Sequence, residues 1–113
     1  MTKNEIIANI NSSLVNLNIN KIILFGSYAR GTQKNDSDID LLVVTNDNFV
    51  FQSFAQKMET KLKIAGALSS VRKFADIDLI VYTKPMFRKF IQLNSSFKNE
   101  IINSGLIIYE ANN

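Results

Sequence analysis

Apolar residues along the chain follow two patterns: a spacing of three or four residues, typical of amphipathic helices, and short continuous runs, typical of buried strands. Thr2 and Glu5 form a capping-box pattern in front of the first helical stretch. The helical spacing predicts helices over residues 2–17, 49–65, 84–93 and 96–104, and a short helix over 27–30. The apolar runs predict strands over residues 21–25, 38–44, 76–82 and 106–109, and residues 110–113 are expected to fray.

The second long helix has three candidate N-caps, Asn46, Asp47 and Asn48, and Gly66 is expected to end it. Residues 68–74, which follow, are expected to form a partly extended connector. The apolar stripe of this helix is expected to face the core, and consists of Phe51, Phe54, Ala55, Met58, Leu62 and Ala65.

With 113 residues and 46% hydrophobic content, the chain is expected to form one domain, residues 1–113, with a substantial core. Helices that alternate with strands predict a sheet covered by helices and, by pattern alone, a parallel α/β sheet. The chain has no run of about 18 apolar residues and no basic segment followed by an apolar one, so neither a membrane span nor a signal peptide is expected. We therefore expect a cytoplasmic protein without a membrane partner.

The chain contains no cysteine and no histidine. Disulfides, thiolate metal sites, thiol nucleophiles, Ser-His hydrolase chemistry and His-ligated zinc are therefore excluded. Any metal must bind to oxygen, which favours Mg2+ or Mn2+. A Gly-Lys-Ser/Thr phosphate loop is also missing from the sequence.

The net charge of +3 is a mild excess, and basic residues gather between the second and third predicted strands. This region could attract nucleotide phosphates, RNA or an acidic partner. An ordinary solvated helix face and loop is the simpler interpretation, and we favour it. The residues concerned are Lys57, Lys61, Lys63, Arg72 and Lys73.

Candidate chemistry lies where the first strand ends and the second begins. Gly26 and Ser27 follow the first strand, and Asp38 and Asp40 open the second. Because side chains alternate along a strand, Asp38 and Asp40 point the same way. Neighbouring carboxylates at the start of a buried strand repel each other, and a divalent cation such as Mg2+, which also holds phosphate, is the usual reason for such a pair.

These residues closely resemble the signature of the nucleotidyltransferase superfamily that includes DNA polymerase β and the kanamycin nucleotidyltransferases. The matching segments are Gly26-Ser27-Tyr28-Ala29-Arg30-Gly31 and Ser37-Asp38-Ile39-Asp40. The signature also has a third acidic residue on a later strand, and Asp78, between Ile77 and Leu79, fits it best. In length, the chain is similar to the minimal nucleotidyltransferases, which occur beside a helical HEPN partner protein.

The resemblance implies an α+β fold of the polymerase β-like nucleotidyltransferase type, with a mixed β-sheet flanked by helices. It implies that Asp38, Asp40 and Asp78 are catalytic and bind two Mg2+ ions, with Mn2+ as a substitute and ATP as substrate. The nucleotide phosphates would be bound by Gly26, which allows close backbone approach, by the Ser27 hydroxyl and by the forked donors of Arg30.

Each of these residues also has a simpler interpretation. Ser27 could be a helix N-cap, and Arg30 could be a surface charge. Asp36 and Asp38 could be turn residues. Asp76 could replace Asp78 as the third ligand, although the apolar neighbours of Asp78 favour Asp78.

In the minimal nucleotidyltransferases the partner is typically a HEPN toxin, and the nucleotidyltransferase acts as its antitoxin by transferring AMP from ATP to a partner tyrosine. The resemblance therefore implies a hetero-oligomer of this chain with a HEPN-domain toxin, without direct nucleic acid binding. Two alternatives remain: an antitoxin that neutralises its partner by binding alone, and a free-standing nucleotidyltransferase for a small-molecule acceptor.

Overall fold

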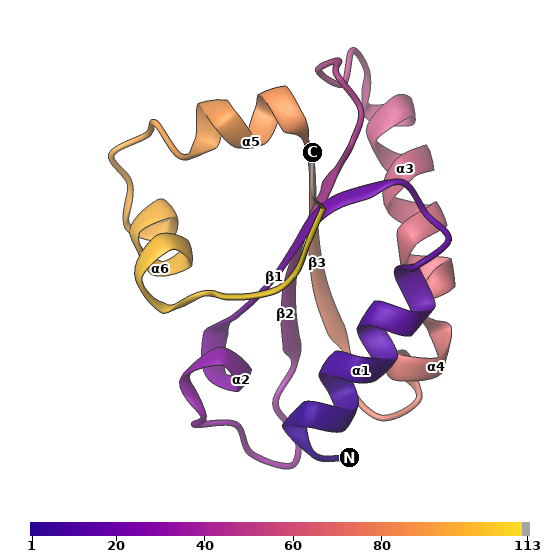
Figure 1. Ribbon diagram of the computed structural model, residues 1–113, viewed down its shortest axis with the longest axis vertical. Coiled ribbons are helices and arrows are strands. Elements are labelled where there is room, and N and C mark those ends of the chain that lie inside the picture. The colour runs from indigo at the N-terminus through magenta and orange to yellow at the C-terminus, as the bar shows by residue number, and fades with distance from the viewer. Residues whose placement is uncertain (112–113) are drawn as a thin grey trace.

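A computed structural model of the chain describes residues 1–111, in which four strands form one mixed sheet (Figure 1). The strand order is β3-β2-β1-β4. Strand β1 pairs in antiparallel fashion with β2 and with β4, whereas β2 and β3 are parallel. The mixed sheet predicted from the resemblance is confirmed, and the all-parallel sheet suggested by the alternation of elements is wrong. The strands are β1 Ile19–Phe25, β2 Ile39–Thr45, β3 Ile77–Thr83 and β4 Leu106–Glu110.

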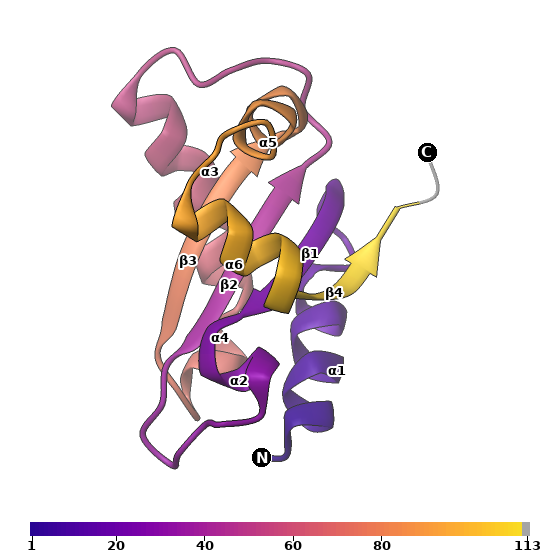
Figure 2. The same ribbon diagram turned by 90° about the vertical axis from the view of Figure 1, so that its left-hand side faces the viewer.

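Helices cover both faces of this sheet. One face packs against α1 (Lys3–Leu14), α3 (Phe54–Ala67) and α4 (Ser69–Arg72). The other face packs against α5 (Lys84–Phe90) and α6 (Ser96–Ser104), which lie in front of the strands in Figure 2. Among the described residues, no helix combines the length and apolarity needed to cross a membrane.

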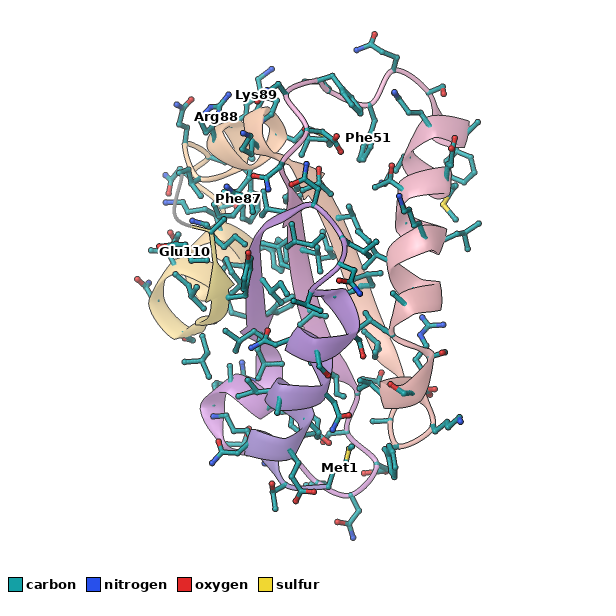
Figure 3. All side chains as sticks on the ribbon, turned by 45° about the vertical axis from the view of Figure 1, so that its right-hand side comes forward. Met1, Phe51, Phe87, Arg88, Lys89 and Glu110 are labelled. Atoms are coloured by element: carbon teal, nitrogen blue, oxygen red, sulfur yellow. The ribbon has the colours of Figure 1, made fainter. Side chains whose placement is uncertain are left out.

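Two hydrophobic clusters hold these layers together. The larger cluster includes Ile10 and Leu14 of α1. The smaller one includes Phe90 of α5 and Ile101 of α6. Figure 3 shows Phe87 of α5 close to the sheet, while Arg88 and Lys89 lie on the outer side of the helix.

The first helix begins as predicted. The Glu5 amide donates to the Thr2 hydroxyl at 3.2 Å, and the Thr2 amide donates to the Glu5 carboxylate at 3.3 Å. The predicted end at residue 17 is wrong, since α1 ends at Leu14. Strand β1 begins at Ile19, two residues earlier than predicted, because Ile19 already pairs with Thr45 of β2.

Helix α3 differs from the sequence prediction in the residue at which it begins and in the side that is buried. It begins at Phe54 after the N-cap Ser53, whose hydroxyl accepts from the Gln56 amide at 3.1 Å, so the predicted start at 49 and its caps are wrong. Gly66 lies inside the helix. Phe54 and Leu62 are 77% and 63% exposed, whereas Ile64 is buried at 2%. The predicted stripe therefore faces outward in part, because apolarity alone does not say which side of a helix meets the sheet.

The segment after α3 is also more helical than predicted. Residues 69–72 form α4, in which the Val71 and Arg72 amides donate to the Leu68 carbonyl. Helix α5 ends at Phe90, short of the predicted residue 93. Helix α6 has the predicted bounds, and its N-cap Ser95 accepts from the Lys98 amide at 3.1 Å. Strand β4 extends to Glu110, against the predicted fraying, and residues 112–113 lie outside the described part of the chain.

Mutations on α3 can test which side of this helix packs against the sheet. Ile64→Ala removes a buried side chain, so we expect the free energy of unfolding to fall by about 2–5 kcal/mol. Leu62→Ala, two residues away and largely exposed, should lower it by less than about 1 kcal/mol. Urea denaturation of the two variants measures the difference. A loss for Leu62→Ala equal to that for Ile64→Ala would contradict the orientation of α3.

Candidate functional site

Two of the three predicted catalytic carboxylates, Asp40 and Asp78, lie on the sheet face that α5 and α6 partly cover, whereas Asp38 precedes β2, which begins at Ile39 and not at residue 38 as predicted. Asp40 of β2 and Asp78 of β3 are directly opposite each other in the parallel pairing. Asp40 precedes Leu42 by two residues, and Leu42 packs in the cluster with Phe90 and Ile101. Because side chains alternate along a strand, Asp40 lies on this same face. The parallel register thus places carboxylates from both strands side by side at the start of β2 and β3.

The Asp40 carboxylate is coupled to its neighbours. Asp40 is half-buried, whereas Asp38 and Asp78 are exposed. Burial raises the pKa of Asp40 above its ordinary value, and repulsion from Asp78, Asp38 and Glu100 raises this pKa further, in that order. Arg30 acts in the opposite direction and lowers the pKa of Asp40. The site therefore concentrates negative charge that a cation would stabilise.

Gly26 is required where it stands because of Asp40. Phe25 pairs with Asp40 across the β1–β2 ladder, and Gly26 follows with a φ of 70°, in the left-handed region. A Cβ atom at this position would overlap the Asp40 carboxylate. Glycine is therefore needed at position 26 for two reasons: it adopts the left-handed conformation of the turn, and it leaves space for the Asp40 carboxylate.

The short helix α2, Gly26–Arg30, carries the other two predicted phosphate-binding residues. Ser27 is partly buried inside this helix, and the N-cap is Phe25, so the interpretation of Ser27 as an N-cap is wrong. Arg30 is exposed, and its Nη1 atom lies 3.6 Å from Oε2 of Glu100 in α6. Glu100 was missed by the sequence analysis, because nothing in the spacing along the chain links α6 to this turn.

The other acidic residues of the site, Asp38, Asp76 and Asp78, differ in where they lie relative to the strands. The turn before β2 is closed by Ser37, whose hydroxyl accepts from the Lys34 amide at 2.8 Å, and Asp38 lies beyond it. Asp76 precedes β3 and is exposed, and its carbonyl accepts from the Ile39 amide at 2.8 Å. Asp78, by contrast, is inside β3 and directly opposite Asp40. This placement favours Asp78 over Asp76 as the third carboxylate, which stays a prediction.

The donor chemistry of the site fits a magnesium ion, since Asp38, Asp40 and Asp78 offer only hard oxygen ligands. Within residues 1–111, however, no three acidic side chains already converge closely enough to hold a metal ion. Two of the three carboxylates are exposed and have room to turn toward the ion. The sequence-predicted residues are thus brought to one edge of the sheet, and their role as ligands stays a prediction.

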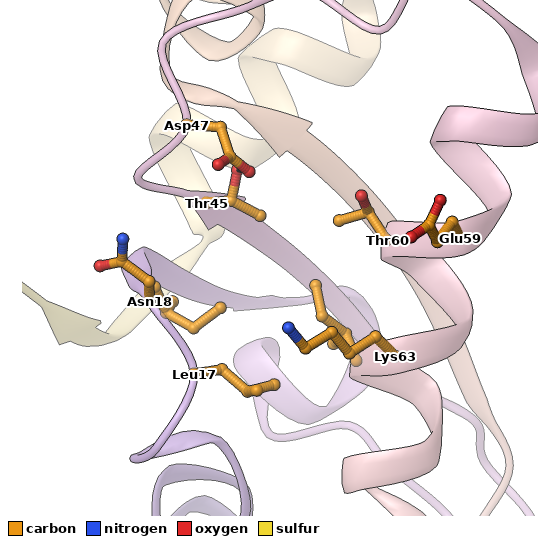
Figure 4. A pocket seen from close by; sticks show the side chains of 9 residues that line it. Leu17, Asn18, Thr45, Asp47, Glu59, Thr60 and Lys63 are labelled. Carbon is orange, nitrogen blue, oxygen red and sulfur yellow. Dashed lines mark hydrogen bonds between the residues drawn. The ribbon is translucent and has the colours of Figure 1, made fainter.

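A different cavity, of about 210 Å3, lies at the other end of β2 (Figure 4). It is lined by residues that include Thr45, Asp47, Glu59 and Lys63. The Thr45 hydroxyl donates to the Asp47 carboxylate at 2.9 Å. This cavity is separated from Asp40 by the length of the strand and contains none of the predicted site residues.

The fold and the arrangement of carboxylates define a nucleotidyltransferase domain. Residues 7–113 match the family model described as Polymerase beta, nucleotidyltransferase. The chain therefore belongs to this nucleotidyltransferase family.

Curated relatives agree with this assignment. The chain is 35% identical over 91 residues to a candidate protein adenylyltransferase of Methanocaldococcus jannaschii, an alignment that covers 80% of this chain and 79% of the relative. It is 37% identical over 83 residues to protein adenylyltransferase MntA of Shewanella oneidensis. That second alignment covers 71% of this chain and 50% of the relative, so the chain spans about half the length of MntA.

Solved structures share the fold. A toxin–antitoxin crystal structure with AMP-PNP matches 99% of this chain and 76% of its own, with a TM-score of 0.54 and 24% identity. A structure of a mutant of the toxin–antitoxin MntA–HpeT matches 99% of this chain and 75% of its own, with a TM-score of 0.50 and 26% identity.

The raised pKa of Asp40 predicts how stability responds to pH. The ionised carboxylate costs stability at pH 7, and this cost disappears once Asp40 is protonated in both states, below about its ordinary value of 3.8. In metal-free buffer, Asp40→Asn should therefore keep or raise the melting temperature at pH 7, and the gain should vanish toward about pH 3.5. Calorimetry from pH 7 to about pH 3.5 measures the difference in melting temperature between Asp40→Asn and the wild type. The exposed Asp76→Asn serves as the control. A lower melting temperature for Asp40→Asn at pH 7 would show a structural role.

The space around Gly26 gives a second test. Gly26→Ala and Gly31→Ala both place a Cβ on a residue with positive φ, 70° and 75°, but only the Gly26 position meets another side chain. We expect Gly31→Ala to lower the free energy of unfolding by about 1–2 kcal/mol from backbone strain alone. Gly26→Ala should cost more, and Asp40→Gly in the same chain should recover the excess. Equal losses for the two alanine variants would mean that Asp40 does not constrain the turn.

Proposed function

We propose that this chain is a Mg2+-dependent nucleotidyltransferase that transfers AMP from ATP to a hydroxyl, a tyrosine hydroxyl of a HEPN-domain toxin, and so acts as an antitoxin. The observation that carries the proposal is the side-by-side placement of Asp40 and Asp78 beneath the Gly26 turn. The relatives named as protein adenylyltransferases support the reaction. The likeness to a toxin–antitoxin structure supports a protein partner. In this proposal residues 1–113 act as a single domain.

Each predicted residue has a role that follows from its position. Asp38, Asp40 and Asp78 would hold Mg2+, which when bound supplies charge neutralisation at the phosphates and activation of the attacking hydroxyl. Gly26 leaves space for the phosphate chain to approach the backbone. The Ser27 hydroxyl donates a hydrogen bond to the phosphate chain, and the forked cationic guanidinium of Arg30 donates further hydrogen bonds to the phosphate oxygens.

The chemistry proposed here is a displacement at phosphorus. The acceptor hydroxyl oxygen forms a bond to the α-phosphorus of ATP while the bond between that phosphorus and the bridging oxygen to the β-phosphorus breaks. Pyrophosphate departs with the bonding electron pair, and the hydroxyl proton passes to a neighbouring carboxylate. The side chains on β1, β2 and β3 chiefly position the reactants in line.

Two other functions are distinguishable from this one. An antitoxin that acts by binding alone would form the same complex with its partner, but its nucleotide site would transfer no AMP. A free-standing enzyme would modify a small molecule and need no partner. The presence of Asp38, Asp40 and Asp78 together favours catalysis over binding alone, since an idle site has no need of a repelling carboxylate cluster.

Co-expression with a candidate HEPN-domain partner protein tests the proposal. After incubation with ATP and Mg2+, mass spectrometry should detect one or more AMP units on the partner and none on this chain. Asp78→Ala should reduce the transfer rate by about a hundredfold or more, because the variant loses a carboxylate opposite Asp40. The complex should persist, because docking uses the surrounding surface.

The matched control is Asp76→Ala, which removes an exposed carboxylate two residues away and should retain most of the activity. Excess chelator should abolish transfer by the wild-type chain. Neutralisation of the partner without any mass change, by wild type and Asp78→Ala alike, would establish the binding-only antitoxin instead.

A further inference from the structure

Glu100 of α6 is a fourth carboxylate near the three predicted metal ligands. Its place is fixed by its neighbours in the helix, because Ile101 is 2% exposed and the Phe97 ring meets the Phe25 ring with 5.5 Å between centroids. Glu100 itself is partly exposed. After burial and the two neighbouring aspartates, repulsion from Glu100 is a further cause of the raised pKa of Asp40. Glu100 therefore adds negative charge where negative charge is already concentrated.

The partner of Glu100 is Arg30 of α2. The Nη1 atom of Arg30 lies 3.6 Å from Oε2 of Glu100, and the two side chains are 48% and 38% exposed. A pair at this distance and exposure contributes little to the stability of the fold, because water and salt screen it. The pair therefore matters more for where the Arg30 guanidinium lies than for the free energy of unfolding.

Arg30 also has Asp40 within reach. Gly26 and Arg30 are four residues apart in α2, and residues at this spacing lie on the same face of a helix. The Gly26 end of this face lies against the Asp40 carboxylate. Arg30 acts on the same carboxylate, since it lowers the pKa of Asp40 against the larger effects of burial and repulsion. Among residues 1–111, however, Arg30 forms its ion pair with Glu100 and not with Asp40.

The choice between these two partners decides what the site can bind. A guanidinium paired with Asp40 would neutralise that carboxylate and cover oxygen atoms that a divalent cation needs. Its forked donors would then be occupied by a carboxylate and not by phosphate. A guanidinium that meets Glu100 through one Nη atom can still direct its other N–H groups to phosphate oxygens.

We propose that Glu100 is a positioning residue, which holds the Arg30 guanidinium toward α6 and away from Asp40. The Asp40 carboxylate then stays open to Mg2+, and Arg30 stays available to the nucleotide phosphates. Glu100 acts through Arg30 and touches neither the metal nor the nucleotide. The inference rests on the proposed function, because that function assigns Mg2+ to Asp40 and phosphate to Arg30.

A double-mutant cycle separates this role from the simple loss of a negative charge. Glu100→Gln keeps the length of the side chain and frees Arg30 to pair with Asp40, so the affinity of the intact chain for Mn2+ should fall by about fivefold or more. In a chain that carries Arg30→Gln, the same change should alter Mn2+ affinity by less than about twofold. Electron paramagnetic resonance of free Mn2+ measures all four affinities. Loss of charge alone would weaken Mn2+ binding equally with and without Arg30.

The matched control is Glu59→Gln on α3. Glu59 lines the cavity at the other end of β2, so this variant makes the same change in net charge far from the carboxylates (Figure 4). It should keep Mn2+ affinity within about twofold of wild type. A loss equal to that of Glu100→Gln would mean that net charge alone controls metal binding, and would overturn the inference.

A crystal structure of metal-free Glu100→Gln shows directly where Arg30 lies and requires no metal binding. We expect the Arg30 guanidinium to be within hydrogen-bond distance, about 3 Å, of an Asp40 carboxylate oxygen. A guanidinium that still points toward α6 in this variant would show that Glu100 does not hold it there.

The outcomes separate this inference from the proposed function. Failure of the wild-type chain to bind Mn2+, both alone and together with AMP-PNP, would overturn the proposed function, wherever Arg30 lies. Saturable Mn2+ binding that Glu100→Gln weakens equally in both backgrounds, or in neither, would overturn the positioning role alone.

Discussion

The repulsion between carboxylates at the start of β2 and β3 is the constraint on which the rest of this site depends. Asp40 is half-buried, and burial together with Asp78 and Asp38 raises its pKa. A carboxylate in such surroundings destabilises the metal-free fold while it is ionised. In the proposed function the same carboxylates would offer hard oxygen ligands to a divalent cation, so the cost in stability and the proposed capacity for phosphate chemistry would have one origin.

The mixed sheet is what brings these groups together. The parallel pairing of β2 with β3 puts Asp40 and Asp78 in the same register at the same end of their strands. The antiparallel pairing of β1 with β2 then brings the end of β1 to that same edge, with Phe25 opposite Asp40 and Gly26 against its carboxylate. An all-parallel sheet would carry the end of β1 to the opposite edge, away from the aspartates. The antiparallel neighbour is therefore a requirement of the site.

Charged side chains lie on both sides of Asp40 and Asp78. Arg30 lies on the β1 side, where it also meets Glu100 of α6. On the β3 side, Arg72 and Lys73 share the wall of a cavity of about 330 Å3 with Asp36, Asp38 and Asp76, so this wall carries more negative than positive charge. Arg72 and Lys73, which the sequence suggested belong to an ordinary solvated face, are exposed and form no ion pair within residues 1–111.

The sequence by itself determined the features that depend on neighbours along the chain. The Thr2–Glu5 capping box, the strand positions, α6 and the spacing of Gly26, Asp38, Asp40 and Asp78 are all local patterns, and the resemblance they carry led to the mixed sheet and the family. Tertiary structure alone decided which face of α3 is buried, the helical form of residues 69–72, the meeting of Arg30 with Glu100, and the cavity beside Asp38. The physical reason is that these features depend on packing between segments distant in sequence, and neither periodicity nor propensity along one segment records what lies against it.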